Sequence, residues 1–275
     1  MTYATLMVHV EPGQSNAALL HVAADLADRF NAGVIGIAAC QPVQVVYGDG
    51  YVPDDLIERD RVEIESEMKK AQAEFRNVLQ PRVTHLDWRS TMAFAPLSDY
   101  LSREARCADL FITGLAAGGF FDGSRQVDTS DLVMQVGRPV LIVPATGIAQ
   151  GFERFVIGWK DTRETRRAVA DALPLLEKAV HVAVVEIADD EDLARARANV
   201  ADVVSWLGRH DIVAEAAASL STGDDASQLY EVARQHGADV IVAGAYGHSR
   251  LREWALGGVT RDLLMRTDQC TLLAH

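Results

Sequence analysis

Paired cysteines, long apolar runs and an excess of positive charge are all missing from this 275-residue sequence. The three cysteines, Cys40, Cys107 and Cys270, are odd in number and far apart, so they lack the spacing of a zinc or redox motif, and we interpret them as core or strand residues. No apolar run approaches the roughly 20 residues that cross a bilayer, and the first ten residues are followed by Glu11 and not by a small-residue cleavage site. The expected location is the cytoplasm, with no membrane contact.

The formal net charge is -13, which is acidic for a chain of this length. Binding to nucleic acid or anionic lipid requires a basic face, so neither partner is expected, and any bound anion has to be held by a local site. No catalytic constellation is visible, because the histidines are scattered and neither an HExxH motif nor a nucleophile elbow occurs. The acidic run at residues 189–192 fits the start of a helix better than a cation site. We therefore predict a protein that is not an enzyme.

What the sequence does contain is an alternation of strand-like and helix-like segments that runs through twice. In the first half we expect strands at residues 5–10, 33–39, 83–88, 109–113 and 139–143, and helices at 15–32, 54–80 and 96–106, with one more short helix before the last strand. In the second half we expect strands at 154–159, 181–187, 213–219, 239–243 and 270–273, and helices at 162–179, 192–207, 224–235 and after Gly257.

A repeated phrase supports this division into two copies. Residues 108–114 read Ala-Asp-Leu-Phe-Ile-Thr-Gly, and residues 238–244 read Ala-Asp-Val-Ile-Val-Ala-Gly. Between the copies, residues 144–151 combine a proline, two glycines and small residues, as a linker does. Strands separated by helices predict right-handed crossovers and a parallel sheet covered on both faces. The fold class is therefore α/β, with two tandem doubly wound domains of about five strands each, at residues 1–147 and 148–275.

A glycine-rich loop follows the fourth strand of the second half. Gly244 and Gly247 are separated by two residues, nine more separate Gly247 from Gly257, and Gly258 comes next. Glycine lets the backbone approach a ligand closely, and the free N–H groups of the helix expected after Gly257 would form an anion site. Thr260 would either cap that helix or offer its hydroxyl to a phosphate.

Basic side chains around this loop favour an anion as its ligand. They are His248, Arg250, Arg252 and Arg261. The contrast with the acidic remainder of the chain strengthens this interpretation. Taken singly, however, each glycine is also what an ordinary turn or hinge would contain.

The spacing Gly-x2-Gly-x9-Gly resembles the signature of universal stress proteins, and the likeness extends over residues 238–273 and, more loosely, over both halves. The resemblance implies a Rossmann-like fold of the adenine-nucleotide alpha-hydrolase type, in which the loop holds the phosphates of ATP or another adenine nucleotide, with or without Mg²⁺. Carried over by position, the implied contacts are Gly244, Gly247, Gly257, Gly258, Val259 and Thr260.

Two positions depart from the family pattern. Lys160, which follows Trp159, stands where the family has an acidic residue, and Gly258 stands where a serine or threonine is expected. The ammonium of Lys160 would pair with a phosphate as a point charge, although it cannot accept a hydrogen bond from a ribose hydroxyl; the alternative is an ordinary surface lysine. Trp159 is either a packing residue or a platform on which a base stacks.

The first half lacks the corresponding loop. When Asp131 is aligned with Asp262, the places of Gly257 and Gly258 fall on Gln126 and Val127, and Asp128 puts a carboxylate where a phosphate would lie. Glu11 lies near the family's acidic position but has no glycines to support it. We expect this half to be structural or to bind something else.

These observations predict a cytoplasmic stress-response protein that binds an adenine nucleotide in its C-terminal half and acts through protein partners. The alternatives are a nucleotide-free scaffold of the same fold and a nucleotide hydrolase, which would need a metal-binding carboxylate and a base that positions water. Because members of the family commonly pair through their last strands, the resemblance also implies an internal pseudo-dimer of the two halves and allows a homodimer.

Overall fold

The computed structural model describes residues 2–42, 54–115, 127–145, 151–245 and 269–275, with no side-chain detail for 54–56. By contacts within the chain it divides into two units, one of Tyr3–Val136 and one made mostly of Gly137–His275. The boundary between domains at residues 147 and 148 stays a prediction, since the contact division instead falls before the last strand of the first repeat. None of the helices in the described ranges is both long enough and apolar enough to cross a membrane.

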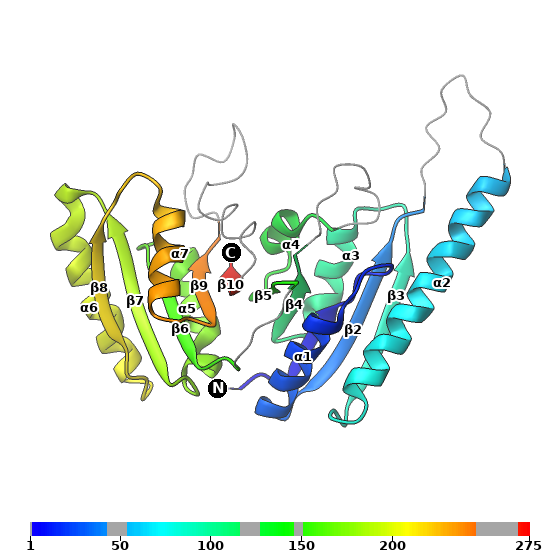
Figure 1. Cartoon of the computed structure of the whole chain (residues 1–275), viewed down its shortest axis with the longest axis horizontal. Helices are drawn as coiled ribbons and strands as arrows, with labels where there is room; N and C mark the ends of the chain where they lie inside the picture. The colour runs from blue at the N-terminus through cyan, green and yellow to red at the C-terminus, as the bar shows by residue number, and fades with distance from the viewer. Residues whose placement is uncertain (1, 43–53, 116–126, 146–150, 246–268) are drawn as a thin grey trace, which may run out of the picture. The chain divides into compact units, whose positions relative to one another are not determined.

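The unit of Tyr3–Val136 contains a parallel sheet in the order β3-β2-β1-β4. Its elements are β1 (Thr5–His9), α1 (Ala17–Phe30), β2 (Gly33–Cys40), α2 (Asp54–Leu79), β3 (Leu86–Met92), α3 (Leu97–Glu104), the 3-10 turn η1 (Ala105–Cys107), β4 (Leu110–Gly114) and α4 (Thr129–Gln135). Figure 1 shows the helices of this unit around its sheet. The order of the strands is that of a doubly wound α/β fold.

The unit of Gly137–His275 contains a sheet in the order β5-β10-β9-β6-β7-β8 (Figure 1). Its elements are β5 (Val140–Val143), β6 (Arg154–Gly158), α5 (Arg163–Leu176), β7 (His181–Ala188), the 3-10 turn η2 (Asp190–Asp192), α6 (Leu193–Gly208), β8 (Glu215–Leu220), α7 (Asp225–Gln235), β9 (Val240–Gly244) and β10 (Cys270–Ala274). Right-handed crossovers place α5 and α6 on one face of this sheet and α7 on the other. The predicted fold class is confirmed.

The sheet of this second unit is parallel except at one pair of strands. β5 runs antiparallel to β10, with Leu141 opposite Leu272. The last strand of the first repeat thus pairs with the last strand of the second. A sequence pattern gives the existence of both strands but not this pairing, because it involves residues about 130 positions apart in the chain.

The repeated phrase has a structural reason, which is the aspartate that precedes β4 and β9. Asp239 Oδ2 accepts hydrogen bonds from the backbone N–H groups of Glu153 and Arg154, at 2.8 and 2.9 Å. Asp109 Oδ2 accepts the same pair of bonds at the start of β1, at 2.8 and 2.9 Å. In each repeat this carboxylate binds the amino end of the first strand to the amino end of the fourth.

Two edge strands, β3 and β8, are less buried than the other strands. β1, β2, β4, β6, β7, β9 and β10 are buried along almost their whole lengths, as expected for parallel strands covered on both faces. β3 and β8 are only partly buried, and both begin later than predicted. The prediction began β3 at Val83, but the N–H of Val83 donates to Leu79 O at 2.8 Å, so this residue finishes the end of α2.

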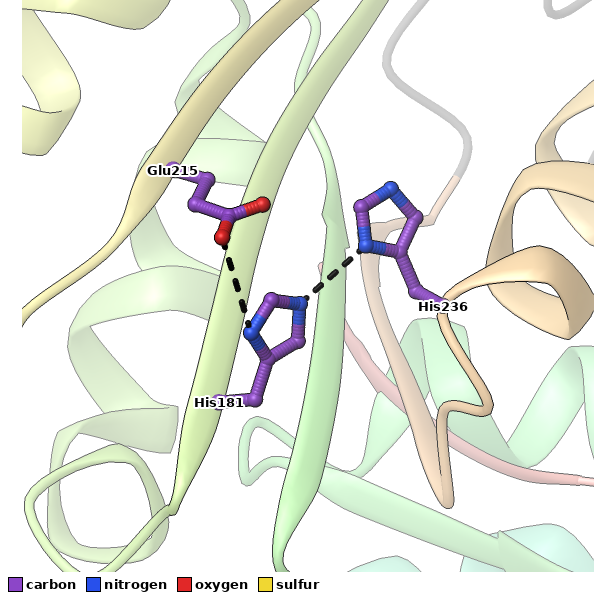
Figure 2. Close-up of side chains that lie close together, drawn as sticks. All are labelled: His181, Glu215 and His236. Carbon is purple, nitrogen blue, oxygen red and sulfur yellow. Dashed lines mark hydrogen bonds and ion pairs between the residues drawn. The ribbon is translucent and has the colours of Figure 1, made fainter.

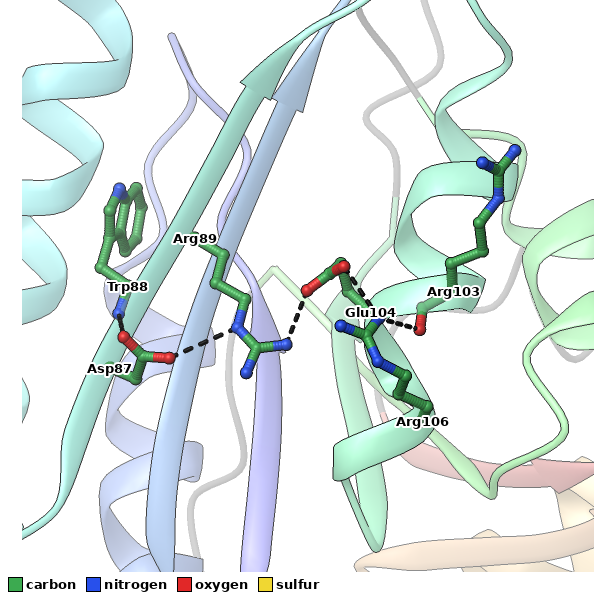
Figure 3. A network of polar contacts seen from close by, with 6 residues as sticks. All are labelled: Asp87, Trp88, Arg89, Arg103, Glu104 and Arg106. Carbon is green, nitrogen blue, oxygen red and sulfur yellow. Dashed lines mark hydrogen bonds and ion pairs between the residues drawn. The ribbon is translucent and has the colours of Figure 1, made fainter.

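The edge strand β3 is held by charged side chains instead of by burial on both faces (Figure 3). Arg89 on β3 contacts Glu104 on α3 at 2.6 Å, and Arg106 contacts the other oxygen of Glu104 at 2.9 Å. The hydrogen bonds from Arg106 and Arg89 hold the pKa of Glu104 below its usual value, although burial opposes this. Polar edge strands of this kind have no apolar alternation from which their bounds can be predicted.

Two smaller predictions are corrected by the structure. The helix predicted at 15–32 ends at Phe30 and is capped by Asn31, which adopts a left-handed conformation with φ of 52°, whereas β2 begins at Gly33 as predicted. Cys40 and Cys270 are buried as predicted, but Cys107 is exposed at the end of η1. The acidic run at 189–192 does precede a helix, because η2 leads directly into α6.

Replacing Asp239 by alanine is expected to lower the free energy of unfolding by about 2 kcal/mol, because two backbone N–H groups at the start of β6 lose their acceptor. Urea denaturation followed by circular dichroism measures this change. Asp202→Ala on the exposed face of α6 is the control and should leave the midpoint nearly unchanged. Equal midpoints for the two variants would contradict the assigned role.

Acid should destabilise the protein through His9, the last residue of β1. Its side chain is buried, its Nδ1 lies 3.1 Å from Thr113 Oγ1, and burial lowers its pKa from 6.5 to about 4. Between these values the unfolded chain binds a proton that the folded chain does not, so stability falls as the pH drops through this range, by up to about 3 kcal/mol.

The measurement is the urea midpoint at neutral pH and again near pH 4.5. We expect His9→Gln to reduce the loss of stability on acidification, whereas the control His21→Gln, at an exposed position of α1, should behave like the unmodified protein. The same acid sensitivity in all three proteins would exclude His9 as the cause.

Candidate functional site

The switch point of the second unit lies between β6 and β9. From β6 the chain continues to β7 on one side, whereas β9 and β10 lie on the other side. The two central strands are parallel and in register, with Gly158 opposite Ala243, so both end at the same edge of the sheet. Ligands of open α/β sheets bind at the carboxyl ends of the strands, at such a reversal of strand order.

Gly244, the first glycine of the predicted loop, is the last residue of β9 and lies at this edge. A Cβ atom at this position would lie 2.4 Å from the backbone nitrogen of Thr165 and 2.7 Å from its hydroxyl oxygen. The first turn of α5 therefore packs directly against the end of β9. This close contact requires glycine at position 244 whether or not a ligand is bound.

Lys160 and Trp159 follow β6 at the same edge. Lys160 is exposed. Trp159 is half-buried, and its backbone N–H donates to Val185 O on β7 at 2.8 Å. Its indole Nε1 is buried and has no hydrogen-bond partner among the described residues. A buried N–H without an acceptor is costly, which makes Trp159 a candidate for a ligand contact at this edge.

A carboxylate that the sequence analysis missed lies beside them. Glu186, near the end of β7, is buried, and its Oε2 accepts a hydrogen bond from Asn199 Nδ2 at 3.2 Å. Burial raises the pKa of Glu186, while the bond from Asn199 and the positive charge of Lys160 oppose that rise. The sequence did contain a feature that could have identified this residue, since Glu186 is the only acidic residue in the apolar strand 181–188.

The amino end of α5 is already occupied by side chains of the chain itself. Thr162 is the N-cap, and its hydroxyl accepts the N–H of Thr165 at 3.3 Å. Glu164 in the first turn is buried and paired with Arg163. A carboxylate is favourable at a helix amino end for the same reason as a phosphate, so this helix start does not need an external anion.

Most of the predicted contacts lie outside the described residues. These are Gly247, His248, Arg250, Gly257, Gly258, Val259 and Thr260, together with the helix expected after Gly257. Of the predicted site, the structure brings together Gly244 and Lys160, at the ends of two adjacent strands. The contacts of the other residues with a ligand stay predictions.

At the corresponding edge of the first unit, an aspartate carboxylate occupies the start of a helix, as the sequence indicated. Asp128 is the N-cap of α4, and its carboxylate accepts the N–H groups of Ser130 and Asp131 at 2.8 and 3.2 Å. The backbone donors that would meet a phosphate are thus bound to a carboxylate. Val127 is buried, and Gln126 lies outside the described residues.

Glu11 of the first unit is tied into a local loop after β1. Its backbone N–H donates to Asn16 Oδ1 at 2.9 Å, and Asn16 Nδ2 donates back to Glu11 O at 3.0 Å. Burial raises the pKa of the Glu11 side chain. The geometry therefore gives this residue a place in a compact turn at the edge of the first sheet.

No protein-family model and no curated protein matches this sequence, but solved structures do. A universal stress protein from Archaeoglobus fulgidus DSM 4304 matches 99% of this chain and 96% of its own length, with a TM-score of 0.72 and 13% identity. A functionally unknown protein from Pseudomonas aeruginosa PAO1 matches 99% of this chain and 92% of its own, with a TM-score of 0.61 and 13% identity. The chain therefore has the fold of a universal stress protein over nearly its full length.

Gly244→Ala is expected to destabilise the protein by about 1–3 kcal/mol, because the added methyl group would overlap the backbone of α5. Gly114 is the matched control, since it ends β4 as Gly244 ends β9 and a Cβ there would meet nothing within 4 Å. Gly114→Ala should be nearly neutral. Urea denaturation of both variants measures the difference, and an unchanged midpoint for Gly244→Ala would disprove the close contact.

Proposed function

We propose that this chain is a tandem universal stress protein whose C-terminal half binds ATP or another adenine nucleotide. The observation that carries the proposal is the position of Gly244, because the loop with the spacing Gly-x2-Gly-x9-Gly begins at the switch point of the second sheet. The spacing of the glycines in the loop and the position of the loop in the fold are independent observations. Their agreement supports a phosphate-binding loop.

The edge of the sheet supplies groups that suit such a ligand. Lys160 offers an exposed ammonium, which would pair with a phosphate as a point charge. Trp159 offers an aromatic ring beside β7 and an indole N–H that has no hydrogen-bond partner among the described residues. Because Lys160 cannot accept a ribose hydroxyl, the nearby Glu186 is the carboxylate best placed to influence that part of the ligand.

The proposed mode of action is binding without turnover, in the cytoplasm, with the nucleotide altering contacts to protein partners. Burial raises the pKa of Glu186, and its carboxylate is engaged by Asn199, so it is poorly suited to hold Mg²⁺ for hydrolysis. The net charge of -13 argues against nucleic acid and anionic membranes as partners. Pairing of the two halves as a pseudo-dimer, and of two chains as a homodimer, belongs to the same proposal.

A nucleotide-free scaffold is the second candidate. It is favoured by the lysine at position 160 in place of an acidic residue and by the packing contact of Gly244, which explains that glycine without a ligand. The two candidate functions therefore differ in whether the glycines that follow Gly244 in the loop contact a nucleotide.

The deciding experiment is calorimetric titration of the purified protein with ATP, AMP and cAMP, each with and without Mg²⁺. We expect saturable binding of one nucleotide per chain, lost in Gly257→Val because a branched side chain would block the approach of phosphate to the backbone. Lys160→Ala should weaken ATP more than AMP, by roughly three- to tenfold, since the lost charge faces the phosphates.

Gly151→Val is the control, because Gly151 lies in the same unit at an exposed position where a Cβ would meet nothing within 4 Å. This variant should bind like the unmodified protein. Absence of binding for every nucleotide would favour the scaffold. Steady release of phosphate from ATP would instead contradict the proposal that the protein binds nucleotide without hydrolysing it.

A further inference from the structure

We propose that His181, Glu215 and His236 form a binding site for a divalent transition-metal ion, with Zn²⁺ as the best fit. His181 is the first residue of β7, Glu215 is the first residue of β8, and His236 is the residue that ends α7. All three lie at the amino ends of the strands, whereas the proposed nucleotide site lies at the carboxyl ends (Figure 2). The two sites are therefore independent.

The distances between the side chains suit one shared ion. His181 Nε2 lies 3.1 Å from His236 Nδ1, and the ligand atoms offered by all three residues lie within 4.8 Å of one another. Two nitrogens bound to one tetrahedral zinc at 2.0–2.1 Å are about 3.3 Å apart. The spacing of the two nitrogens therefore suits a shared ion, once the rings turn so that both lone pairs point to it.

The carboxylate completes the set. Glu215 Oε1 lies 4.0 Å from His181 Nδ1, and the Glu215 side chain is 67% exposed, so it can turn toward an ion between the rings without a loss of packing. Because His181 Nδ1 is not the ring nitrogen that faces His236, the Glu215 carboxylate has to turn around the His181 ring to reach an ion shared with Nε2. Its negative charge would then offset part of the charge of the ion. With three protein ligands, the fourth position of a tetrahedral ion is left to water.

The chemistry of the ligands selects the class of metal. Two imidazoles and one carboxylate favour Zn²⁺, Cu²⁺ or Ni²⁺, whereas Mg²⁺ and Ca²⁺ prefer sites made only of oxygen. Without a metal, one imidazole must donate a hydrogen bond to the other. A bound ion would replace that shared proton and accept both lone pairs.

Neighbouring contacts hold the two histidines in place. Arg154 Nε donates to the backbone oxygen of His236 at 2.8 Å, which fixes the end of α7. The backbone N–H of His181 donates to Glu153 O at 3.0 Å. The rings of His181 and His236 are stacked, with centroids 5.3 Å apart. Both side chains are half-buried, so little side-chain freedom remains to be lost on binding.

A metal at this position would join β7, β8 and α7 at one edge of the unit. These elements are otherwise connected there through the sheet and through the histidine pair. Because the ion binds only the folded arrangement, Zn²⁺ in excess should raise the thermal midpoint of unfolding. The effect would be absent when either histidine is removed.

The test is calorimetric titration of the untagged full-length chain, freed of metal by dialysis against EDTA and then against buffer. ZnCl₂ is expected to bind with one strong site that His181→Ala and His236→Ala each weaken by at least about tenfold, whereas MgCl₂ should give no saturable binding. Glu215→Gln should weaken Zn²⁺ by a smaller factor. The control His21→Ala, at an exposed position of α1, should bind Zn²⁺ like the unmodified chain.

Co²⁺ provides a readout that a merely structural histidine pair would not give. Its visible absorption reports the coordination geometry, and we expect a spectrum that is lost in His236→Ala and kept in His21→Ala. Circular dichroism establishes that each variant is folded, and Glu215→Gln tests an exposed residue on which folding does not depend. The proposal is overturned if the unmodified chain binds no stoichiometric Zn²⁺, or if both histidine variants bind it as tightly as the control does.

Discussion

The carboxylate of Asp239 is the contact on which the geometry of the second unit depends. It binds the first backbone N–H groups of β6 from the start of β9, and so fixes two strands that are far apart in the sequence side by side. With that register set, Gly158 and Gly244 end at one edge, where the chain diverges to either side of the sheet. Asp109 does the same in the first unit, which explains why the phrase around it recurs.

The carboxyl edge of the second unit combines packing with the chemistry of a site. Gly244 lets the first turn of α5 approach β9, so packing explains its lack of a side chain, and the argument for a nucleotide depends on where the loop begins and on the spacing of the glycines that follow. Beside it, the exposed charge of Lys160 faces a buried carboxylate on β7. Lys160 stands where the family has an acidic residue, and Glu186 supplies an acidic residue from the neighbouring strand β7.

Much of the fold was predictable because its signals are local. Buried parallel strands such as β7 are continuous apolar runs, and α1 shows its buried face at three- and four-residue intervals, so both were found close to their bounds. The bounds of the edge strands β3 and β8 were predicted less well, and those of β3 were wrong by three residues or more at each end, because half-exposed strands carry no such signal. The exposure of Cys107 was missed for a related reason, since residue type alone does not give burial.

By itself, the sequence determined the class of fold, the internal repeat and the spacing of the glycine loop, because these follow from residue type and periodicity along the chain. The pairing of β5 with β10 agrees with the pairing of last strands that the family resemblance implied, although residue patterns alone did not give it. Only the tertiary structure decided that Gly244 packs against Thr165 and that Glu186 lies at the same edge as Lys160. It alone also brought His181 and His236 together across 55 positions. Each of these contacts depends on how strands are ordered in a sheet, and strand order is set by long-range pairing that no local pattern records.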